Sequence, residues 1–235
     1  MTATRPPSPT ALDLAFLTDL DGVTDLVLVR HGEQDYDRRS ATVGDSVDPP
    51  LSARGREQAR LVGERFREEP VDVIYASPLA RALDTGLAIA AHHGMDPIVL
   101  SDLREVEIFR DLPRDQPVTD SVSRHALLGA RSRMVRDRKW DVYPHSESSA
   151  EFSQRVVNVL EGIVASHPGQ RVVVACHGGV INTYLGWILG IGADMWFRPA
   201  HTAVNFARAL DLQRSVAAIG DVHHLSTSDG GLVSY

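Results

Sequence analysis

The segment LVLVRHGEQDYD (26–37) begins with four consecutive apolar residues and then presents Arg30 and His31 directly after them. An apolar run without alternation is typical of a strand that is buried on both faces, as the strands of a parallel sheet are. The same pattern occurs in VDVIYA (71–76) and in RVVVAC (171–176). The three segments therefore predict the core of a mostly parallel sheet.

Helical patterns separate these strands. LSARGREQARLVGERFREE (51–69) has Ser52 as a predicted N-cap, and SPLARALDTGLAIAAHHG (77–94) has Ser77 as a predicted cap followed by proline at the first helical position. In SSAEFSQRVVNVLEGIVASHPG (148–169), a capping-box pattern precedes one apolar stripe. Strands that alternate with helices predict an α/β fold, a three-layer α/β/α sandwich with a mostly parallel sheet.

Three regions depart from this alternation. TAVNFARALDL (202–212) and SVAAIG (215–220) predict a final hairpin at the edge of the sheet. Residues 1–23 predict a Pro-rich tail with a short docked turn, so the predicted domain covers residues 24–235. Residues from about 104 to 147 are rich in Arg, Asp, Ser and Pro with weak apolar periodicity, which predicts an insertion packed over the sheet and the active site.

Composition and charge exclude several classes of protein. The chain has 24 basic and 31 acidic residues and a formal net charge of -7, which disfavours binding to nucleic acid or to an anionic membrane surface. No stretch reaches the roughly 18 apolar residues that a membrane span needs. The single cysteine, Cys176, excludes an internal disulfide framework and a Cys-rich zinc site, and it suits a cytoplasmic protein.

Two of the predicted strands end in the same way. His31 follows the first strand and His177 follows RVVVAC, and each is followed at once by a glycine, Gly32 or Gly178. Ligands of parallel sheets bind beyond the carboxyl ends of the strands, where the strand order reverses. Glycine lets backbone amides approach a bound anion. The sequence therefore predicts two imidazoles facing one anion-binding crevice.

Two arginines add to this prediction. Arg81 lies in the first turn of a predicted helix, where the helix dipole disfavours a cation by a few tenths to about 1 kcal/mol, so an anion is expected nearby. Arg30 brings a second guanidinium to the end of the first strand. Two arginines, glycine amides and two histidines are suited to a tetrahedral dianion such as phosphate.

The histidines also suggest a reaction. An imidazole can attack phosphorus to give a phosphohistidine while arginines neutralise the charge on the phosphoryl oxygens. A carboxylic acid is then needed to protonate the leaving alkoxide. Glu105 and Glu107 follow the short predicted strand PIVL (97–100), whose end should reach the same crevice.

The ordered motifs resemble those of the histidine phosphatase superfamily, which has the phosphoglycerate mutase-like fold. The resemblance runs from about residue 25 to about residue 225. It is carried by RHGE (30–33), LSARGREQA (51–59), ASPLARALDT (76–85), LREVEIF (103–109), SESSAEFSQRV (146–156) and ACHGGVI (175–181).

The resemblance implies a role for each motif residue. His31 would accept the phosphoryl group, Arg30, Arg81 and His177 would clamp it, and Glu105 would donate the proton. It also implies that no metal ion or other cofactor is needed. The substrate would be a small phosphate ester, with inorganic phosphate as a further ligand, and no nucleic acid or membrane partner is expected.

Some positions depart from the family pattern. Asp37 replaces the usual asparagine after RHGE, and we leave it out of the site because a carboxylate repels phosphate. The acid motif continues as EIFRDLPRD rather than into a glycine, which keeps Glu107 as the alternative proton donor. His177 is followed by Gly178 and Gly179, which resembles the phosphatase branch.

The main hypothesis is a metal-independent phosphomonoesterase of histidine acid phosphatase type that acts on a small phosphorylated metabolite. One alternative is a mutase-type phosphotransferase. A second is a catalytically weak protein that binds phospho-ligands, and a third is a metallohydrolase that uses the histidines as ligands. Substrate isomerisation, phosphate binding without turnover and sensitivity to chelators distinguish them.

Other groups are predicted to be structural or exposed. Glu33 would order its loop, and Cys176 would be a buried inert thiol. The basic residues in 131–139 form a solvated helical face or attract a multiply charged substrate. TYLGWILGIGADMWF (183–197) is apolar enough for a subunit contact in a possible homodimer. The remaining histidines are predicted to be structural or surface groups, among them His92, His93, His223 and His224.

Overall fold

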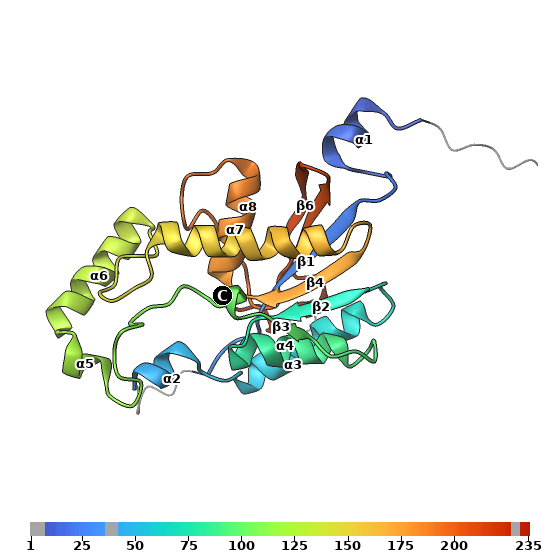
Figure 1. Ribbon diagram of the computed structural model, residues 1–235. Helices are drawn as coiled ribbons and strands as arrows, with labels where there is room; N and C mark the ends of the chain where they lie inside the picture. The colour runs from blue at the N-terminus through green and yellow to red at the C-terminus, as the bar shows by residue number, and fades with distance from the viewer. Residues whose placement is uncertain (1–7, 36–41, 227–230) are drawn as a thin grey trace, which may run out of the picture.

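The computed structural model describes residues 8–35, 42–226 and 231–235 (Figure 1). Asp37 therefore lies outside the described residues. The chain has six described strands: β1 (Thr24–Arg30), β2 (Val73–Ala76), β3 (Ile98–Val99), β4 (Arg171–Cys176), β5 (Val204–Leu210) and β6 (Gln213–Asp221). Its described helices and helical turns are α1 (Ala11–Phe16), α2 (Val43–Val47), α3 (Ala53–Phe66), α4 (Ala80–Ala90), η1 (Ser101–Leu103), α5 (Val118–Ser121), α6 (Arg124–Asp137), α7 (Ser149–Ser166), α8 (Gly178–Leu189) and η2 (His223–Leu225).

The strands form one sheet in the order β3-β2-β4-β1-β5-β6. The first four strands in this order are parallel, and β5 and β6 run antiparallel to their neighbours. The predicted mostly parallel sheet and its C-terminal hairpin are confirmed. Within this hairpin, β6 lies at one edge of the sheet, whereas β5 lies inside the sheet against β1.

Two helical layers cover the sheet. Helices α3 and α4 lie on one face and α7 and α8 on the other (Figure 1). Leu26 and Leu28 of β1 pack in the core under α7 and α8, while Val27 and Val29 pack in the core with α3 and α4. Both faces of β1 are therefore buried, which explains its unbroken apolar run and confirms the three-layer prediction.

This arrangement creates a switch point at the centre of the sheet. β1 and β4 are neighbours, yet β1 leads into the layer of α3 and β4 leads directly into α8 on the opposite face. Their carboxyl ends therefore open a crevice between the two helical layers, where α/β proteins bind ligands.

Two of the three predicted helix caps, Ser52 and Ser148, are confirmed. Ser52 accepts a hydrogen bond from the amide of Gly55 at 3.0 Å, and Ser148 and Glu151 form the complete capping box of α7. The prediction for α4 was wrong, because this helix begins at Ala80 after a Leu79 N-cap, and Ser77 is not its cap. The Ser77 hydroxyl lies instead beside the imidazole of His177, at 2.7 Å from Nε2.

The predicted insertion contains α5 and α6, which extend past the carboxyl ends of the strands rather than lying on a sheet face (Figure 1). Phe109, Leu112 and Val122 form a small core there with Val43 of α2. The insertion therefore packs against a segment near residue 43, a contact that the sequence did not indicate.

The N-terminal segment completes the described fold. In the tail region, the described part holds α1, which contacts β6 and is followed by the buried Leu17. Across residues 8–35, 42–226 and 231–235, no helix combines the length and the apolar character that a membrane crossing requires.

Candidate active site

The two predicted histidines meet at the switch point. The amide of His31 donates to the carbonyl of Cys176 at 2.9 Å, which continues the β1–β4 ladder up to the crevice. Beyond this bond, the ring centroids of His31 and His177 are 5.2 Å apart, with planes tilted by 58°. Two imidazoles that are far apart in the sequence therefore lie within reach of one tetrahedral anion.

The contacts of His31 define its tautomer. Its Nδ1 lies 2.7 Å from the carbonyl oxygen of Gly32, which only accepts, so Nδ1 carries the proton. The Nε–H of Arg81 donates to Nε2 at 3.3 Å, so Nε2 keeps its lone pair. Burial and the nearby charges of Arg81, His177 and Arg30 lower the pKa of His31 well below its usual value. The ring is thus neutral, with an unprotonated Nε2.

His177 is fully buried at the N-cap position of α8. Its Nε2 lies 2.7 Å from the hydroxyl of Ser77, whereas Nδ1 is buried without a hydrogen-bond partner among the described residues. Burial, followed by the charges of Arg81 and Arg30, lowers the pKa of His177 well below its usual value. A buried polar nitrogen without a partner is costly, so a ligand at Nδ1 would satisfy it. Ser77 is a site residue that the sequence analysis assigned to capping.

Arg81 occupies the predicted place in the first turn of α4 and is 6% exposed. Its Nη1 donates to the carbonyl of Val47 at 3.1 Å and lies 3.7 Å from the carboxylate of Asp48. Asp48 also accepts a hydrogen bond from the amide of Ala80 at 2.9 Å. The protein itself therefore supplies part of the negative charge that we expected at this helix terminus.

Arg30 is half-buried at the end of β1, and its Nη1 donates to the carbonyl of Pro199. Gly178 lies next to it, since a Cβ built on Gly178 would be 3.7 Å from Nε of Arg30. That distance is an ordinary contact, so nothing steric requires glycine at position 178.

Glu105 reaches the crevice after β3 and η1, as predicted. One carboxylate oxygen accepts from the amide of Gly179 at 3.0 Å, and the other accepts from the amide of Val106 at 3.0 Å. A Cβ on Gly179 would overlap the Glu105 carboxylate. Gly179, rather than Gly178, is therefore the glycine whose missing side chain the site requires.

Glu107, the alternative acid, has a different environment. Its carboxylate lies 3.3 Å from Nε of Arg104, and its amide donates to Glu147 at 3.2 Å. Glu107 lines only one of the two cavities beside the site, whereas Glu105 lines both. Because Glu105 contacts the first turn of α8, next to His177, we keep it as the predicted proton donor.

A buried ion pair holds the segment that carries Glu105. The Arg155 guanidinium binds both oxygens of Glu147, at 2.9 and 2.6 Å. Nη1 of Arg155 also donates to the carbonyls of Asp102 and Arg104, at 2.7 and 3.0 Å. In the sequence, Glu147 and Arg155 stood out only as part of a motif, since their contacts depend on how α7 packs against η1.

Two cavities flank the site and share Glu105, Met134 and Trp140. One, of about 490 Å³, includes Arg81. The other, of about 580 Å³, includes Arg30. Since an arginine of the predicted phosphate clamp lines each cavity, a phosphate bound between them would have room for its leaving group on either side. Further cationic residues are Arg104 and Arg114 in the first cavity and Arg138 and Arg198 in the second.

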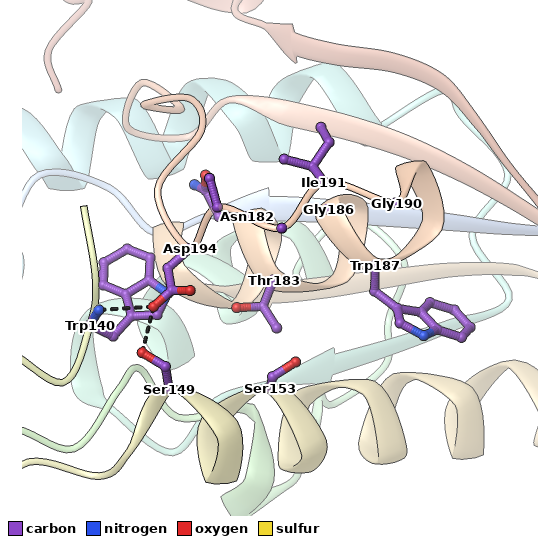
Figure 2. A pocket seen from close by; sticks show the side chains of 12 residues that line it. Trp140, Ser149, Ser153, Asn182, Thr183, Gly186, Trp187, Gly190, Ile191 and Asp194 are labelled. Atoms are coloured by element: carbon purple, nitrogen blue, oxygen red, sulfur yellow. Dashed lines mark hydrogen bonds between the residues drawn. The ribbon is translucent and has the colours of Figure 1, made fainter. Parts of the chain in front are cut away.

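A third pocket, of about 360 Å³, adjoins these cavities between α7 and α8. Figure 2 shows Ser153 of α7 and Thr183 of α8 lining it, with Asp194 near Trp140 and Ser149. Asp194 accepts from the amide of Trp140 at 3.1 Å and from the Ser149 hydroxyl at 2.5 Å. Asp194 thereby fixes Trp140, which lines all three cavities.

Helices α3 and α4 both form hydrogen bonds to the loop after His31. The amide of Gly32 donates to the hydroxyl of Thr85 at 3.1 Å, and the amide of Glu33 donates to Gln58 at 2.8 Å. The Glu33 carboxylate accepts from Ser52 at 2.9 Å, which fits its predicted role in ordering the loop.

The other predicted groups fall outside the centre. Cys176 is fully buried, and burial raises its pKa, as expected for an inert thiol. His224 bonds to Thr202 at 3.0 Å, while His92 and His93 lie in turns after α4. Within the described part of the chain, no three His, Cys, Asp or Glu side chains form a group that could hold a metal ion. One buried histidine near His31, His201, had no signal in the sequence.

Fold and site together define a class of protein: an α/β protein whose switch point brings two buried imidazoles together, one of them bonded to an arginine. The model of the histidine phosphatase superfamily (branch 1) matches residues 26–217. The chain belongs to this superfamily.

Its relatives include phosphatases and phosphoglycerate mutase-like proteins. The chain is 31% identical over 172 residues to a Hydrogenobacter thermophilus protein provisionally named phosphoserine phosphatase 2, covering 73% of this chain and 82% of the relative. It is 31% identical over 205 residues to phosphoglycerate mutase-like protein 4 of Arabidopsis thaliana, covering 86% of each chain. A mycobacterial glucosyl-3-phosphoglycerate phosphatase has the same fold, with a TM-score of 0.68 at 23% identity over 84% of this chain and 99% of that one.

Proposed function

We propose that the protein is a metal-independent phosphomonoesterase that acts through a phosphohistidine on His31. The observation that carries the proposal is the neutral His31 imidazole, whose Nδ1–H is bound to Gly32 and whose Nε2 keeps its lone pair beside Arg81. Phosphatase names among the relatives support it.

In the first step, Nε2 of His31 attacks phosphorus and the bond to the ester oxygen breaks. Arg30, Arg81 and Nδ1 of His177 bind the phosphoryl oxygens, and the Nδ1–H···O=C bond to Gly32 stabilises the positive charge that develops on the His31 ring. Glu105, protonated, gives its proton to the leaving alkoxide.

In the second step, the Glu105 carboxylate accepts a proton from water as the water oxygen attacks phosphorus. The N–P bond breaks, its electron pair returns to Nε2 of His31, and inorganic phosphate leaves. Glu105 is again protonated, so one carboxyl group serves both half-reactions.

The test compares the wild-type protein with His31→Asn on para-nitrophenyl phosphate and on a panel of sugar, amino-acid and nucleotide phosphates. We expect acid-labile phosphate on the wild-type protein only and a fall in turnover of about 10³-fold or more in the variant. His125→Asn, on the exposed surface of α6, is the matched control. Equal turnover in His31→Asn and His125→Asn would refute the proposal.

The same assay separates the alternatives. A chelator should leave turnover unchanged, whereas a metallohydrolase would lose activity. Binding of vanadate or phosphate without turnover would identify a phospho-ligand binding protein. The Arabidopsis relative's name favours a mutase as the second candidate. Conversion between 2- and 3-phosphoglycerate faster than phosphate release would support it.

A further inference from the structure

The loop of residues 199–203 is joined to the end of β1 on the side away from His177. The amide of Arg30 donates to the carbonyl of Ala203 at 3.1 Å, and the amide of Thr202 donates to the carbonyl of His31 at 3.3 Å. The guanidinium of Arg30 donates to Pro199 in the same loop. Hydrogen bonds therefore connect this loop to Arg30 and His31, two residues of the proposed phosphate site.

His201 brings a third imidazole to the nucleophile. It is 3% exposed, and its ring centroid lies 5.7 Å from that of His31, about as near as the ring of His177. Its Nε2 is buried without a hydrogen-bond partner among the described residues. Burial, together with the charges of Arg30 and Arg198, lowers the pKa of His201 to about 3, so the ring is neutral at physiological pH.

The segment 231–235 holds the His201 ring in place. Ser234 accepts from the amide of His201 at 2.8 Å through its carbonyl, and its hydroxyl lies 2.9 Å from Nδ1 of His201. Nε2 of Gln58 donates to the same hydroxyl at 3.0 Å. Because Gln58 supplies a proton to this oxygen, the hydroxyl proton is free to point at Nδ1 and to hold His201 as the Nε2–H tautomer.

Gln58 also links the segment 231–235 to the loop that follows His31. Its Nε2 also donates to the carbonyl of Leu232 at 2.6 Å, while its Oε1 accepts from the amide of Glu33 at 2.8 Å. The segment 231–235 thus bridges the loop of residues 199–203 and the loop that follows His31. Arg198 adds an anchor, since it donates to the carbonyl of Tyr235 at 2.7 Å and lies over its ring.

Backbone strain at Thr202 indicates that the loop is held in place. Thr202 is fully buried and has φ of 56°, a left-handed conformation that β-branched residues rarely adopt. Its hydroxyl donates to the carbonyl of His201 at 2.8 Å and lies 3.0 Å from Nε2 of His224. Strained residues persist where the surrounding structure over-determines them, and they concentrate at functional sites.

We propose that Ser234 and His201 form a positioning device that holds the His31 imidazole in its attacking orientation. Neither residue contacts the phosphate in this proposal. The device acts by packing the His201 ring against His31 and by joining the loop of residues 199–203 to the loop that follows His31. The proposal rests on the proposed phosphohistidine chemistry, and it extends that chemistry to the segment 231–235.

The test uses the full-length protein and three variants: Ser234→Ala, which removes the hydroxyl but keeps the backbone bonds, Ser234→Thr, which restores a hydroxyl, and Ser226→Ala, an exposed serine, as the control. We expect Ser234→Ala to form phosphohistidine roughly tenfold more slowly in a rapid-quench burst, less than the hundredfold loss that a 1 Å displacement can cause. Its affinity for inorganic phosphate should stay within about twofold of the wild-type value, since Arg30 and Arg81 are unchanged. Ser234→Thr should recover most of the rate.

A readout that needs no turnover separates this proposal from the proposed function. In histidine-labelled protein, the ring ¹⁵N shifts of both His201 and His31 should change in Ser234→Ala and not in Ser226→Ala. A merely structural role predicts a lower melting temperature with an unchanged His31 signal, and that result would overturn the proposal. So would a burst rate equal to that of the wild-type protein. If the wild-type protein forms no phosphohistidine, the proposed function fails, and the His31 shifts alone still decide whether Ser234 positions the ring.

Discussion

The hydroxyl of Ser77 lies 2.7 Å from Nε2 of His177, and the two residues are 100 positions apart in the chain. Ser77 directly follows β2 and His177 directly follows β4, which are neighbouring parallel strands. The hydrogen bond orients the imidazole so that Nδ1, the nitrogen without a described partner, remains available to a ligand. Nε2 of His177 therefore bonds within the protein, and Nδ1 is left for a ligand of the proposed site.

We predict that Ser77→Ala weakens this orientation. The variant loses one buried hydrogen bond and leaves Nε2 of His177 without a partner, which costs about 1–3 kcal/mol. Turnover should fall about tenfold, and the Ki of inorganic phosphate should rise because His177 is part of the proposed phosphate clamp. Ser132→Ala, on the exposed face of α6, is the control and should change neither value. Unchanged phosphate inhibition in Ser77→Ala would contradict this role for His177.

Gly179→Ala should impair proton donation rather than phosphate binding. The added Cβ would overlap the Glu105 carboxylate and displace it. Turnover of an alkyl phosphate, whose leaving group needs a proton, should fall about 10²-fold, while para-nitrophenyl phosphate, with a good leaving group, should lose much less. An equal loss on both substrates would argue against Glu105 as the acid.

Gly162→Ala is the matched glycine control for that experiment. Gly162 lies inside α7, and a Cβ there would meet nothing within 4 Å. Alanine in a helix interior should raise the free energy of unfolding by about 0.5–1 kcal/mol and leave turnover unchanged. Urea denaturation measures the first effect.

Arg155→Lys should loosen the segment that carries Glu105. Lysine keeps the charge but cannot bind both oxygens of Glu147 and the carbonyls of Asp102 and Arg104 together. We expect turnover to fall about tenfold and the protein to lose about 1–3 kcal/mol of stability, because the pair is buried. Arg60→Lys, an exposed arginine of α3, should show neither change, and a similar effect in both variants would contradict the prediction.

Stability should fall as the pH decreases from about 6.5 toward 4. Burial lowers the folded-state pKa of His224 to about 4, whereas the unfolded histidine titrates near 6.5, so the unfolded chain binds more protons in this range. His31, His177 and His201 contribute in the same direction. The stabilisation is therefore fully present above about pH 6.5 and is lost on acidification.

Urea denaturation at pH 7.5 and pH 5.0 measures this loss. In His224→Asn the difference between the two pH values should shrink by about 1 kcal/mol, a figure that allows for the partial exposure of His224. His125→Asn, at an exposed position, should leave the difference unchanged. A His224→Asn protein with the full wild-type pH dependence would show that this histidine does not contribute.

Much of the site was predictable because its residues directly follow or begin strands and helices that the sequence pattern identifies. His31, His177 and Arg81 lie at the ends or starts of elements whose apolar patterns are unambiguous, and parallel strands bring those ends to one edge. The capping of α3 and α7 followed from their sequences for the same reason. Ser77 was misassigned because a serine before a helix resembles a cap, and only the neighbouring strand shows that its hydroxyl faces His177.

The sequence by itself determined the alternation of strands and helices, the family motifs and the type of chemistry, because these depend on residue periodicity and on neighbouring residues. Only the tertiary structure decided which groups surround the proposed nucleophile, His31. Arg155 reaches the acid segment across about 50 positions, and Ser234 reaches His201 across about 30, as the separations of the bonded residues show. Such contacts arise from the packing of elements that are distant in the chain, and residue type alone does not encode them.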